Sequence, residues 1–282
     1  MPGPISISAS MRANLLALQN TSMLQDMTQE RLATGKKVNS ALDNPSSYFT
    51  AQSLNNRAGD LSDRLDGIGQ SLQTLKAADK ALTAITSLVN QAKALANNAV
   101  ENIGVTATVI KNAADFNLVM SQINAAVNDA SYKGVNLLKA SPDNLIATFN
   151  ENGTSKLTVT GVDSTFTGLT LWSANQAAAG DTTGEWGTVS GINKTISQVT
   201  NALTTLRTTA ASFGTASAII QTREDFAKNL ISTLRAGADK LTLADMNEEA
   251  ANMLALQTQR QMGTNSLSMA SQAAQSVLQM FR

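Results

Sequence analysis

The chain has 282 residues, and its 21 lysine and arginine residues balance 21 aspartate and glutamate residues. This length can bury a core without disulfides, and the balanced charge offers no basic field for a nucleic acid backbone or an anionic membrane surface. The absence of cysteine and histidine excludes thiolate nucleophiles, Ser-His-Asp triads and nearly all zinc sites. We therefore expect no catalytic site, no metal, no cofactor, and neither nucleic acid nor a membrane as partner.

The N-terminal region argues against a cleaved signal peptide, because no positive segment precedes its apolar residues and Leu15, Leu16 and Leu18 are interrupted by Ala and Gln. No run approaches 18 apolar residues, so nothing is expected to span a bilayer. Only four prolines occur, which leaves two long stretches without an obligatory helix breaker. Very long helices are therefore permitted.

The first of these helices is predicted from Pro45 to about Glu101, with Asn44 as its N-cap. Its apolar residues alternate steps of four and three, which is the heptad seam of a coiled coil. The seam comprises Leu54, Ala58, Leu61, Leu65, Ile68, Leu72 and Leu75. Asp79 occupies the next position, after which Leu82 and Val89 resume the frame. An unbroken helix of this extent would be about 80 Å long.

The middle of the chain changes character after a second helix predicted over 107–131. Residues 134–191 are rich in glycine and threonine and contain both tryptophans. Residues 145–149 and 156–160 read as two short strands joined by a turn at 150–154. Because a single hairpin is marginal alone, we expect it to lie against the helices.

Helical periodicity returns over 192–237, where the predicted stripe ends with Phe226, Leu230 and Leu234, and again over 241–282. The sequence thus predicts a mainly α fold of long antiparallel coiled-coil helices forming a rod, with a small β-hairpin and an irregular middle. A single methionine is more often a filler of the core, but the clustering of methionines near both ends of the chain fits adaptable packing surfaces that neighbouring copies complete.

Three candidate motifs for binding or catalysis are weak. Residues 34–37 lack the spacing of a phosphate-binding loop, and residues 67–69 lack the third glycine of a dinucleotide-binding turn. The acidic residues Asp245, Glu248 and Glu249 could offer carboxylates to a cation, but their helical spacing favours a solvated face or a helix start.

Residues 31–43 resemble the bacterial flagellin signature R-L-S-S-G-x-R-I-N-S-A-x-D, and residues 243–250 with 277–282 are similar to the flagellin C-terminal region. The resemblance covers about residues 6–138 and 200–282. The departures are residues 44–47, where flagellins often carry D-A-A-G, and a short middle that implies the loss of large outer domains.

The resemblance implies a structural subunit that is exported unfolded and self-assembles into a hollow helical filament for motility. Residues 1–42 and 239–282 would form an inner coiled-coil domain, and 43–238 a rod domain with a variable segment at 138–190. The implied partners are further copies of the chain, the flagellar cap and hook-associated proteins, and an export chaperone at the C-terminal segment. The implied location is the extracellular filament.

The resemblance also implies two sets of functional residues. The expected assembly interface comprises Met11, Leu15, Leu18, Arg31, Leu32, Asn39, Asp43, Asn247, Leu267, Ala270, Ala274, Val277 and Phe281. Residues 89–95 align with the segment that the animal innate flagellin receptor recognises, usually L-Q-R-x-R-E-L. Gln91 and Ala94 replace an arginine and a glutamate there while Leu95 is retained, so we expect weak receptor contact.

Three other classes compete with a filament subunit. A hook-filament junction protein resembles flagellin at both ends and is the nearest alternative. An enzyme inserted in a flagellin-like frame conflicts with the absence of histidine and with a middle too short for a catalytic domain. A secreted adaptor or membrane-active bundle would need a strongly basic amphipathic face, which the sequence does not show.

Overall fold

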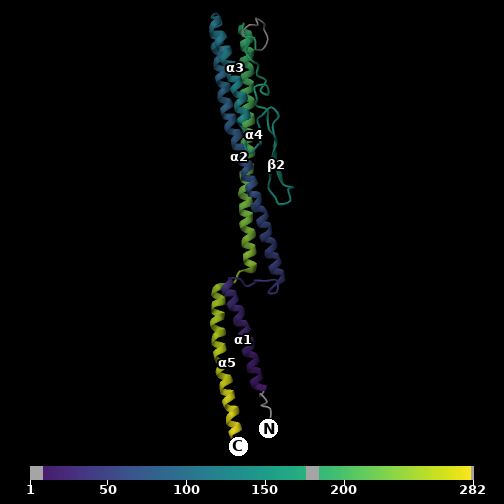
Figure 1. Ribbon diagram of the computed structural model, residues 1–282, viewed down its shortest axis with the longest axis vertical. Coiled ribbons are helices and arrows are strands. Elements are labelled where there is room, and N and C mark those ends of the chain that lie inside the picture. The colour runs from purple at the N-terminus through teal and green to yellow at the C-terminus, as the bar shows by residue number, and fades with distance from the viewer. Residues whose placement is uncertain (1–8, 176–183, 281–282) are drawn as a thin grey trace. The chain divides into compact units, whose positions relative to one another are not determined.

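A computed structural model describes residues 9–175 and 184–280 and confirms a mainly α fold (Figure 1). The elements are α1 (Ala9–Thr34), α2 (Pro45–Glu101), α3 (Thr106–Asp129), β1 (Leu145–Thr148), β2 (Lys156–Val159), α4 (Val189–Thr242) and α5 (Met246–Met280). They form two compact units: unit 1 is Met1–Arg57 with Ser232–Arg282, and unit 2 is Ala58–Ile231. Across the described residues, no helix combines the length and hydropathy needed to cross a membrane.

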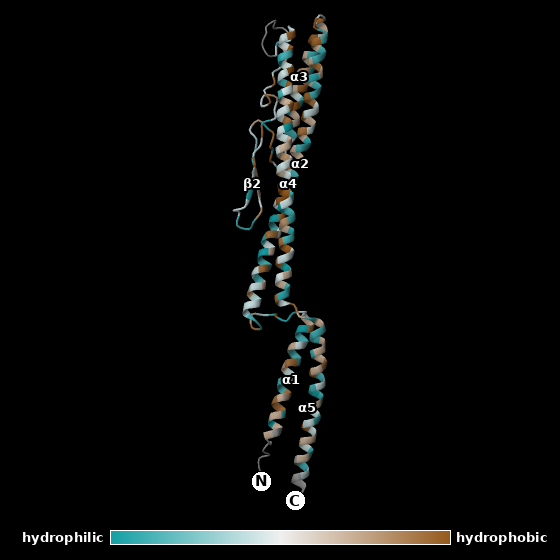
Figure 2. Ribbon diagram, turned by 180° about the vertical axis from the view of Figure 1, so that it is seen from behind, coloured by the Kyte–Doolittle hydropathy of each residue, from teal (hydrophilic) through white to brown (hydrophobic). Residues whose placement is uncertain are grey.

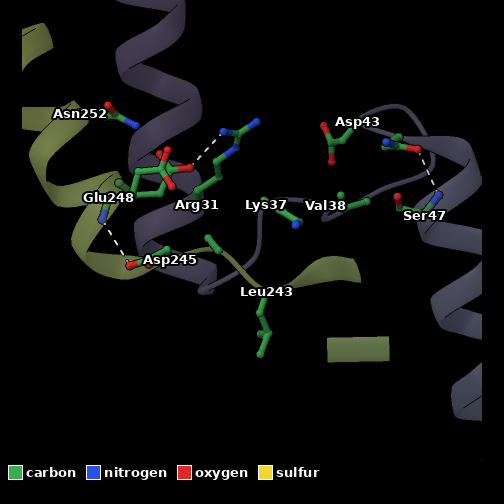
Figure 3. A pocket seen from close by; sticks show the side chains of 12 residues that line it. Arg31, Lys37, Val38, Asp43, Ser47, Leu243, Asp245, Glu248 and Asn252 are labelled. Carbon is green, nitrogen blue, oxygen red and sulfur yellow. Dashed lines mark hydrogen bonds and ion pairs between the residues drawn. The ribbon is translucent and has the colours of Figure 1, made fainter. Parts of the chain in front are cut away.

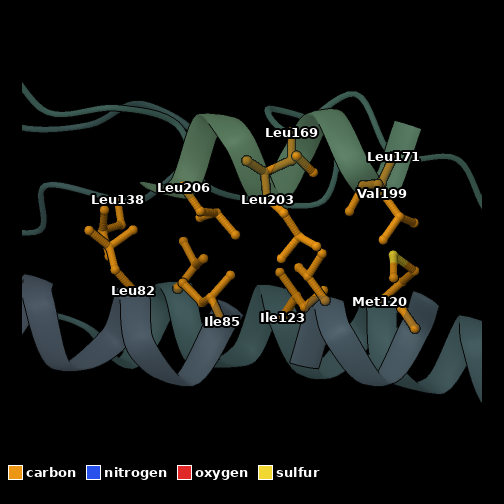
Figure 4. Close-up of a cluster of buried hydrophobic side chains, with 14 of the residues drawn as sticks. Leu82, Ile85, Met120, Ile123, Leu138, Leu169, Leu171, Val199, Leu203 and Leu206 are labelled. Carbon is orange, nitrogen blue, oxygen red and sulfur yellow. The ribbon is translucent and has the colours of Figure 1, made fainter. Parts of the chain in front are cut away.

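Unit 2 has a continuous apolar core between α2, α3 and α4. Ile85 of α2 and Ile123 of α3 lie on one side of this core and point toward Leu206 and Leu203 of α4, while Leu82 of α2 lies opposite Leu138 (Figure 4). Trp186, which is fully buried, closes the core beside Phe116 of α3, with 5.0 Å between the ring centroids. The indole N–H of Trp186 donates to the Thr195 hydroxyl at 3.3 Å, so its polar atom is paired inside the core.

The predicted start of α2 is confirmed, because Asn44 Oδ1 accepts the backbone N–H of Ser47 at 3.0 Å. The seam bypasses Asp79, which is exposed, and uses Ala78 instead. From Leu75 the buried positions continue as Ala78, Leu82, Ile85, Val89, Ala92, Ala96 and Ala99. The steps from Leu72 to Leu75 and from Leu75 to Ala78 are both of three residues. From there on, one of the two buried positions in each heptad lies one residue earlier than the predicted seam, as after a heptad discontinuity in a coiled coil.

The predicted stripe of α4 is wrong near Phe226, whose side chain is 58% exposed, and Leu230 is only half-buried. Ala227 and Ile231 are buried in their place. The buried positions of α4 continue from Phe213 through Ala216 and Ile220 to Ala227 and Ile231. The prediction is therefore displaced by one residue at Phe226 and Leu230, and it is confirmed at Leu234, which is buried.

The predicted hairpin is confirmed: β1 and β2 pair antiparallel, with Leu145 opposite Val159. It runs beside α4 in both ribbon views (Figures 1 and 2). Ala147 is buried and Ile146 is 55% exposed, so the strand has an inner and an outer face. The Arg223 guanidinium of α4 lies 5.6 Å from the centroid of the Phe149 ring and links the hairpin to the helix.

Candidate assembly surface

Helices α1 and α5 of unit 1 run side by side in opposite directions (Figure 1). Asn14, near the start of α1, donates to the hydroxyl of Ser266, far along α5, at 3.5 Å. Arg31, near the end of α1, pairs at 3.0 Å with Glu249, near the start of α5. Two antiparallel helices of the N- and C-terminal regions thus form one pair.

The face of α1 that packs on α5 is largely polar. Its buried and half-buried positions recur in steps of three and four. They are Met11, Asn14, Leu18, Thr21, Gln25, Thr28 and Leu32. Gly263 of α5 permits close approach, because a Cβ atom there would lie 3.0 Å from Leu18 Cδ1. This seam buries few large apolar side chains for its length.

The opposite faces of the two helices carry large exposed apolar side chains. We call six of them the back-face residues: Leu16, Met23 and Met27 of α1, and Leu254, Met262 and Met269 of α5. Their exposed fractions run from 46% for Met27 to 66% for Leu254. With 3.6 residues per turn, each set lies about opposite the seam of its own helix. Each helix of the pair therefore carries a row of exposed apolar side chains on the face that the other helix does not cover, and exposed apolar side chains gathered on one face are typical of an interaction site.

The segments that flank the pair are joined by main-chain hydrogen bonds. Lys37 N–H donates to Thr242 O at 2.8 Å, and Ala244 N–H donates to Gly35 O at 3.0 Å. Gly35 has a φ of +70°, which a side chain would strain. The signature segment after α1 is thus tied to the segment that leads into α5.

Two aspartates organise these connections. Asp43 Oδ2 accepts the backbone N–H groups of Ser40 and Asn39, each at 2.9 Å. These hydrogen bonds, that from Ser40 first, lower the pKa of the Asp43 carboxyl. Asp245 Oδ1 accepts the N–H of Asn247 at 2.9 Å and so begins α5, which confirms the helix-start interpretation for Asp245.

A hollow of about 580 Å³ lies where these connections meet (Figure 3). Its lining includes Arg31, Asp43, Asp245, Glu248 and Glu249. The solvated-face interpretation is wrong for Glu249, which is 7% exposed because it pairs with Arg31 across the helix pair. Its Oε2 atom has no hydrogen-bond partner. In the part of the chain that the structure describes, no three acidic side chains are placed to hold a metal ion.

The structure distributes the expected interface residues over three settings. Met11, Leu18, Leu32, Leu267 and Ala270 are half-buried in the helix pair, and Leu15 is exposed. Arg31, Asn39, Asp43 and Asn247 lie at the connections. Ala274 and Val277 belong to α5, but their side chains, like Phe281, fall outside the described part of the chain. Gln91 and Ala94 are exposed on α2, and Leu95 packs against the unit 2 core.

Sequence reasoning missed the back-face residues. A signal for them was present, since residues 16, 23 and 27 follow one another in steps of seven and four. Polar residues between them obscure this signal, and so does the neighbouring apolar stripe of Met11, Leu15 and Leu18. Sequence reasoning likewise gave no partner for Glu249, because the two residues of its ion pair lie 218 positions apart.

Comparison with known proteins identifies the family. The model of the bacterial flagellin N-terminal helical region matches residues 5–143, and that of the C-terminal helical region matches residues 196–281. Flagellin FljM of Caulobacter vibrioides is 32% identical over 271 residues, which cover 95% of this chain and 96% of the relative. The chain belongs to the bacterial flagellins.

Further relatives agree. The flagellin of Brucella melitensis is 30% identical over 291 residues, covering 99% of both chains, and flagellin C of Rhizobium meliloti is 26% identical over 315 residues. The short middle of this flagellin therefore has counterparts in relatives that it matches almost end to end. The resemblance drawn from residues 31–43 and 243–250 is confirmed, and the protein is a structural subunit of the flagellar filament. Nothing in these comparisons favours the hook-filament junction protein.

Proposed function

We propose that neighbouring copies of this flagellin bind to the back faces of α1 and α5 when the filament forms. The observation that carries the proposal is the exposure of large apolar side chains away from the seam: Met23, Leu254 and Met269 are at least 60% exposed, while the α1 side of the seam contains the polar residues Asn14, Thr21, Gln25 and Thr28. A second copy is the partner that an apolar helix face of a self-assembling subunit fits best, since coiled-coil faces pair with one another.

Covering the back-face residues would remove apolar area from water, and this burial favours association. Full burial of a large apolar side chain contributes about 1.5–3 kcal/mol, so covering the exposed half of each back-face residue contributes about 1 kcal/mol. Six such residues would supply about 6 kcal/mol per copy before the costs of association are subtracted.

The domain layout expected from the resemblance is part of the proposal. Residues 1–42 and 239–282 form the inner coiled-coil layer, residues 43–238 form the rod, and 138–190 is its variable segment. The hydrogen bonds of Lys37 with Thr242 and of Ala244 with Gly35 support this layout, because they tie the inner-layer ends together. In this layout Arg31, Asn39 and Asp43 stabilise the segments that connect the helices, and so keep α1 in position for its contacts with other copies.

The other proposed partners are those that the resemblance to flagellins implies, and the exposure of two residues of α2 bears on one of them. The subunit is exported to the extracellular filament, with a chaperone on its C-terminal segment, and polymerises beneath the cap onto hook-associated proteins. It acts as a structural protein and not as an enzyme. Contact with the animal innate receptor is weak, since the exposed side chains at Gln91 and Ala94 offer neither the guanidinium fork nor its charged companion.

The test compares matched charge substitutions on exposed positions. Met23→Asp and Leu254→Asp place a carboxylate on the two back faces, and Gln19→Asp and Gln257→Asp place one on exposed polar positions of the same helices. Sedimentation and electron microscopy should show filaments of constant width for the wild type and both controls, and monomers for the two back-face variants. Normal filaments from Met23→Asp and Leu254→Asp would refute the proposal.

A further inference from the structure

Methionine supplies much of the apolar surface on the back faces. The chain has ten methionines and no cysteine, so thioethers are its only sulfur groups. Met23, Met27, Met262 and Met269 are 60%, 46%, 61% and 65% exposed. By contrast, Met120 is 2% exposed inside the unit 2 core. We call the first four the back-face methionines.

We propose that the back-face methionines are oxidation sites through which peroxide blocks assembly of the free subunit, while the filament protects them. The inference rests on the proposed function, because it needs the back faces to be accessible in the subunit and covered in the polymer. The back faces would then carry modification sites as well as subunit contacts, and the reactant would be a hydroperoxide.

The chemistry is a balanced two-electron oxygen transfer. The thioether sulfur attacks one oxygen of hydrogen peroxide, an S–O bond forms as the O–O bond breaks, and the second oxygen leaves as water after proton transfer. The sulfur is oxidised to a sulfoxide and the peroxide is reduced. The reaction needs only a sulfur that solvent can reach, which the exposure of the four side chains provides.

The consequence follows from the change in polarity. A sulfoxide oxygen is a strong hydrogen-bond acceptor, and covering it with an apolar helix face without a donor is unfavourable. Loss of apolar contact at even one site would raise the free subunit concentration needed for assembly by about fivefold. The leucines on the same faces, Leu16 and Leu254, carry no sulfur and would not respond.

The experiment treats free subunit and finished filament with the same hydrogen peroxide concentration. Peptide mass spectrometry measures sulfoxide at each methionine, and sedimentation measures assembly. In the free subunit we expect the back-face methionines to oxidise at least tenfold faster than Met120, and oxidised subunit to remain unassembled. Methionine sulfoxide reductases of both epimer specificities should restore assembly, which separates sulfoxide formation from other damage.

A matched pair of variants completes the test. Met23→Leu, Met27→Leu, Met262→Leu and Met269→Leu combined conserve volume and should give a subunit that still assembles after peroxide treatment. Met120→Leu should remain as sensitive as the wild type. If the combined variant does not assemble, reductase treatment of the oxidised wild-type subunit still tests whether sulfoxide formation blocks assembly.

The outcomes separate the two proposals. Unchanged assembly of wild-type subunit that carries all four sulfoxides would overturn the oxidation proposal while leaving subunit contact at the back faces intact. Equal oxidation rates in filament and free subunit would show that the back faces stay uncovered, and both proposals would fail. Recovery by the reductases together with protection in the filament would support both.

Discussion

The ion pair between Arg31 and Glu249 should respond unequally to loss of its two partners. The side chain of Arg31 is 36% exposed, whereas that of Glu249 is 9% exposed. Arg31→Ala therefore leaves a buried carboxylate without its cation, which costs about 3 kcal/mol in buried pairs. Glu249→Gln leaves a guanidinium that water can reach, and the amide can still accept its hydrogen bond, so the cost should be about 1 kcal/mol or less.

Hydrogen exchange of backbone amides in the full-length subunit measures this difference, because it reports local opening of the helix pair. At about 1.4 kcal/mol per tenfold, Arg31→Ala should lower protection near the start of α5 by about 100-fold, and Glu249→Gln by about fivefold or less. The combined change Arg31→Met with Glu249→Leu should recover most of the protection, since an apolar pair of similar volume replaces a buried ion pair well.

The ordering of the variants is the critical result. Equal losses for Arg31→Ala and Glu249→Gln, or a larger loss for the second, would show that the exposure difference does not govern the energetics. Amides of unit 2, such as that of Met120 in the buried core, serve as the internal control and should keep their protection in all three variants.

Four further predictions concern other parts of the molecule. Hydrogen bonds lower the pKa of Asp43, so the stability that its carboxylate contributes to the connecting segment is complete above the unfolded pKa of about 4 and is lost as pH falls through the lower folded pKa. Hydrogen exchange of the Ser40 amide should accelerate in that pH range, and it should accelerate less in Asp43→Asn. A ten-residue tag after Gly153, at the exposed hairpin turn, should leave folding and filament formation intact by circular dichroism and microscopy, since loop closure costs only about 0.6 kcal/mol per doubling of length. Gln91→Arg with Ala94→Glu should raise the response of receptor-bearing cells, and a wild-type response that already equals that of a flagellin carrying both charges would contradict this. Removal of residues 267–282 should abolish sedimentable polymer and leave the cooperative melting of unit 2 nearly unchanged.

Local signals in the sequence were enough to predict the main elements. Asn44 and Pro45 mark the start of α2 because capping depends on neighbours within three residues. The two strands and their turn were predicted for the same reason, as both strand composition and turn residues are local. The signature at residues 31–43 identified the family because it is long and specific.

What the sequence could not supply depends on packing between distant segments. Phe226 and Ala227 both fit a helical period, and the phase that α4 adopts in the folded chain decides which is buried. The same holds for Asp79 and Ala78 in α2. Glu249 has the composition of a solvated helix start, and only the antiparallel pairing of α1 with α5 brings Arg31 to it.

The contrast between the two units connects folding to assembly. Unit 2 buries Trp186, Phe116 and Met120 among three helices and so has the apolar area to fold without a neighbour. The α1–α5 seam instead contains Thr21 and Thr28 at positions where a stable coiled coil would carry leucine. Ordering each residue costs about 1 kcal/mol or more, which a seam with polar residues at these positions offsets less well than the unit 2 core does. We therefore expect the terminal pair to be less stable than unit 2 in the free subunit and to gain stability as neighbouring copies cover its back faces, so that addition to the filament completes the stabilisation of the subunit.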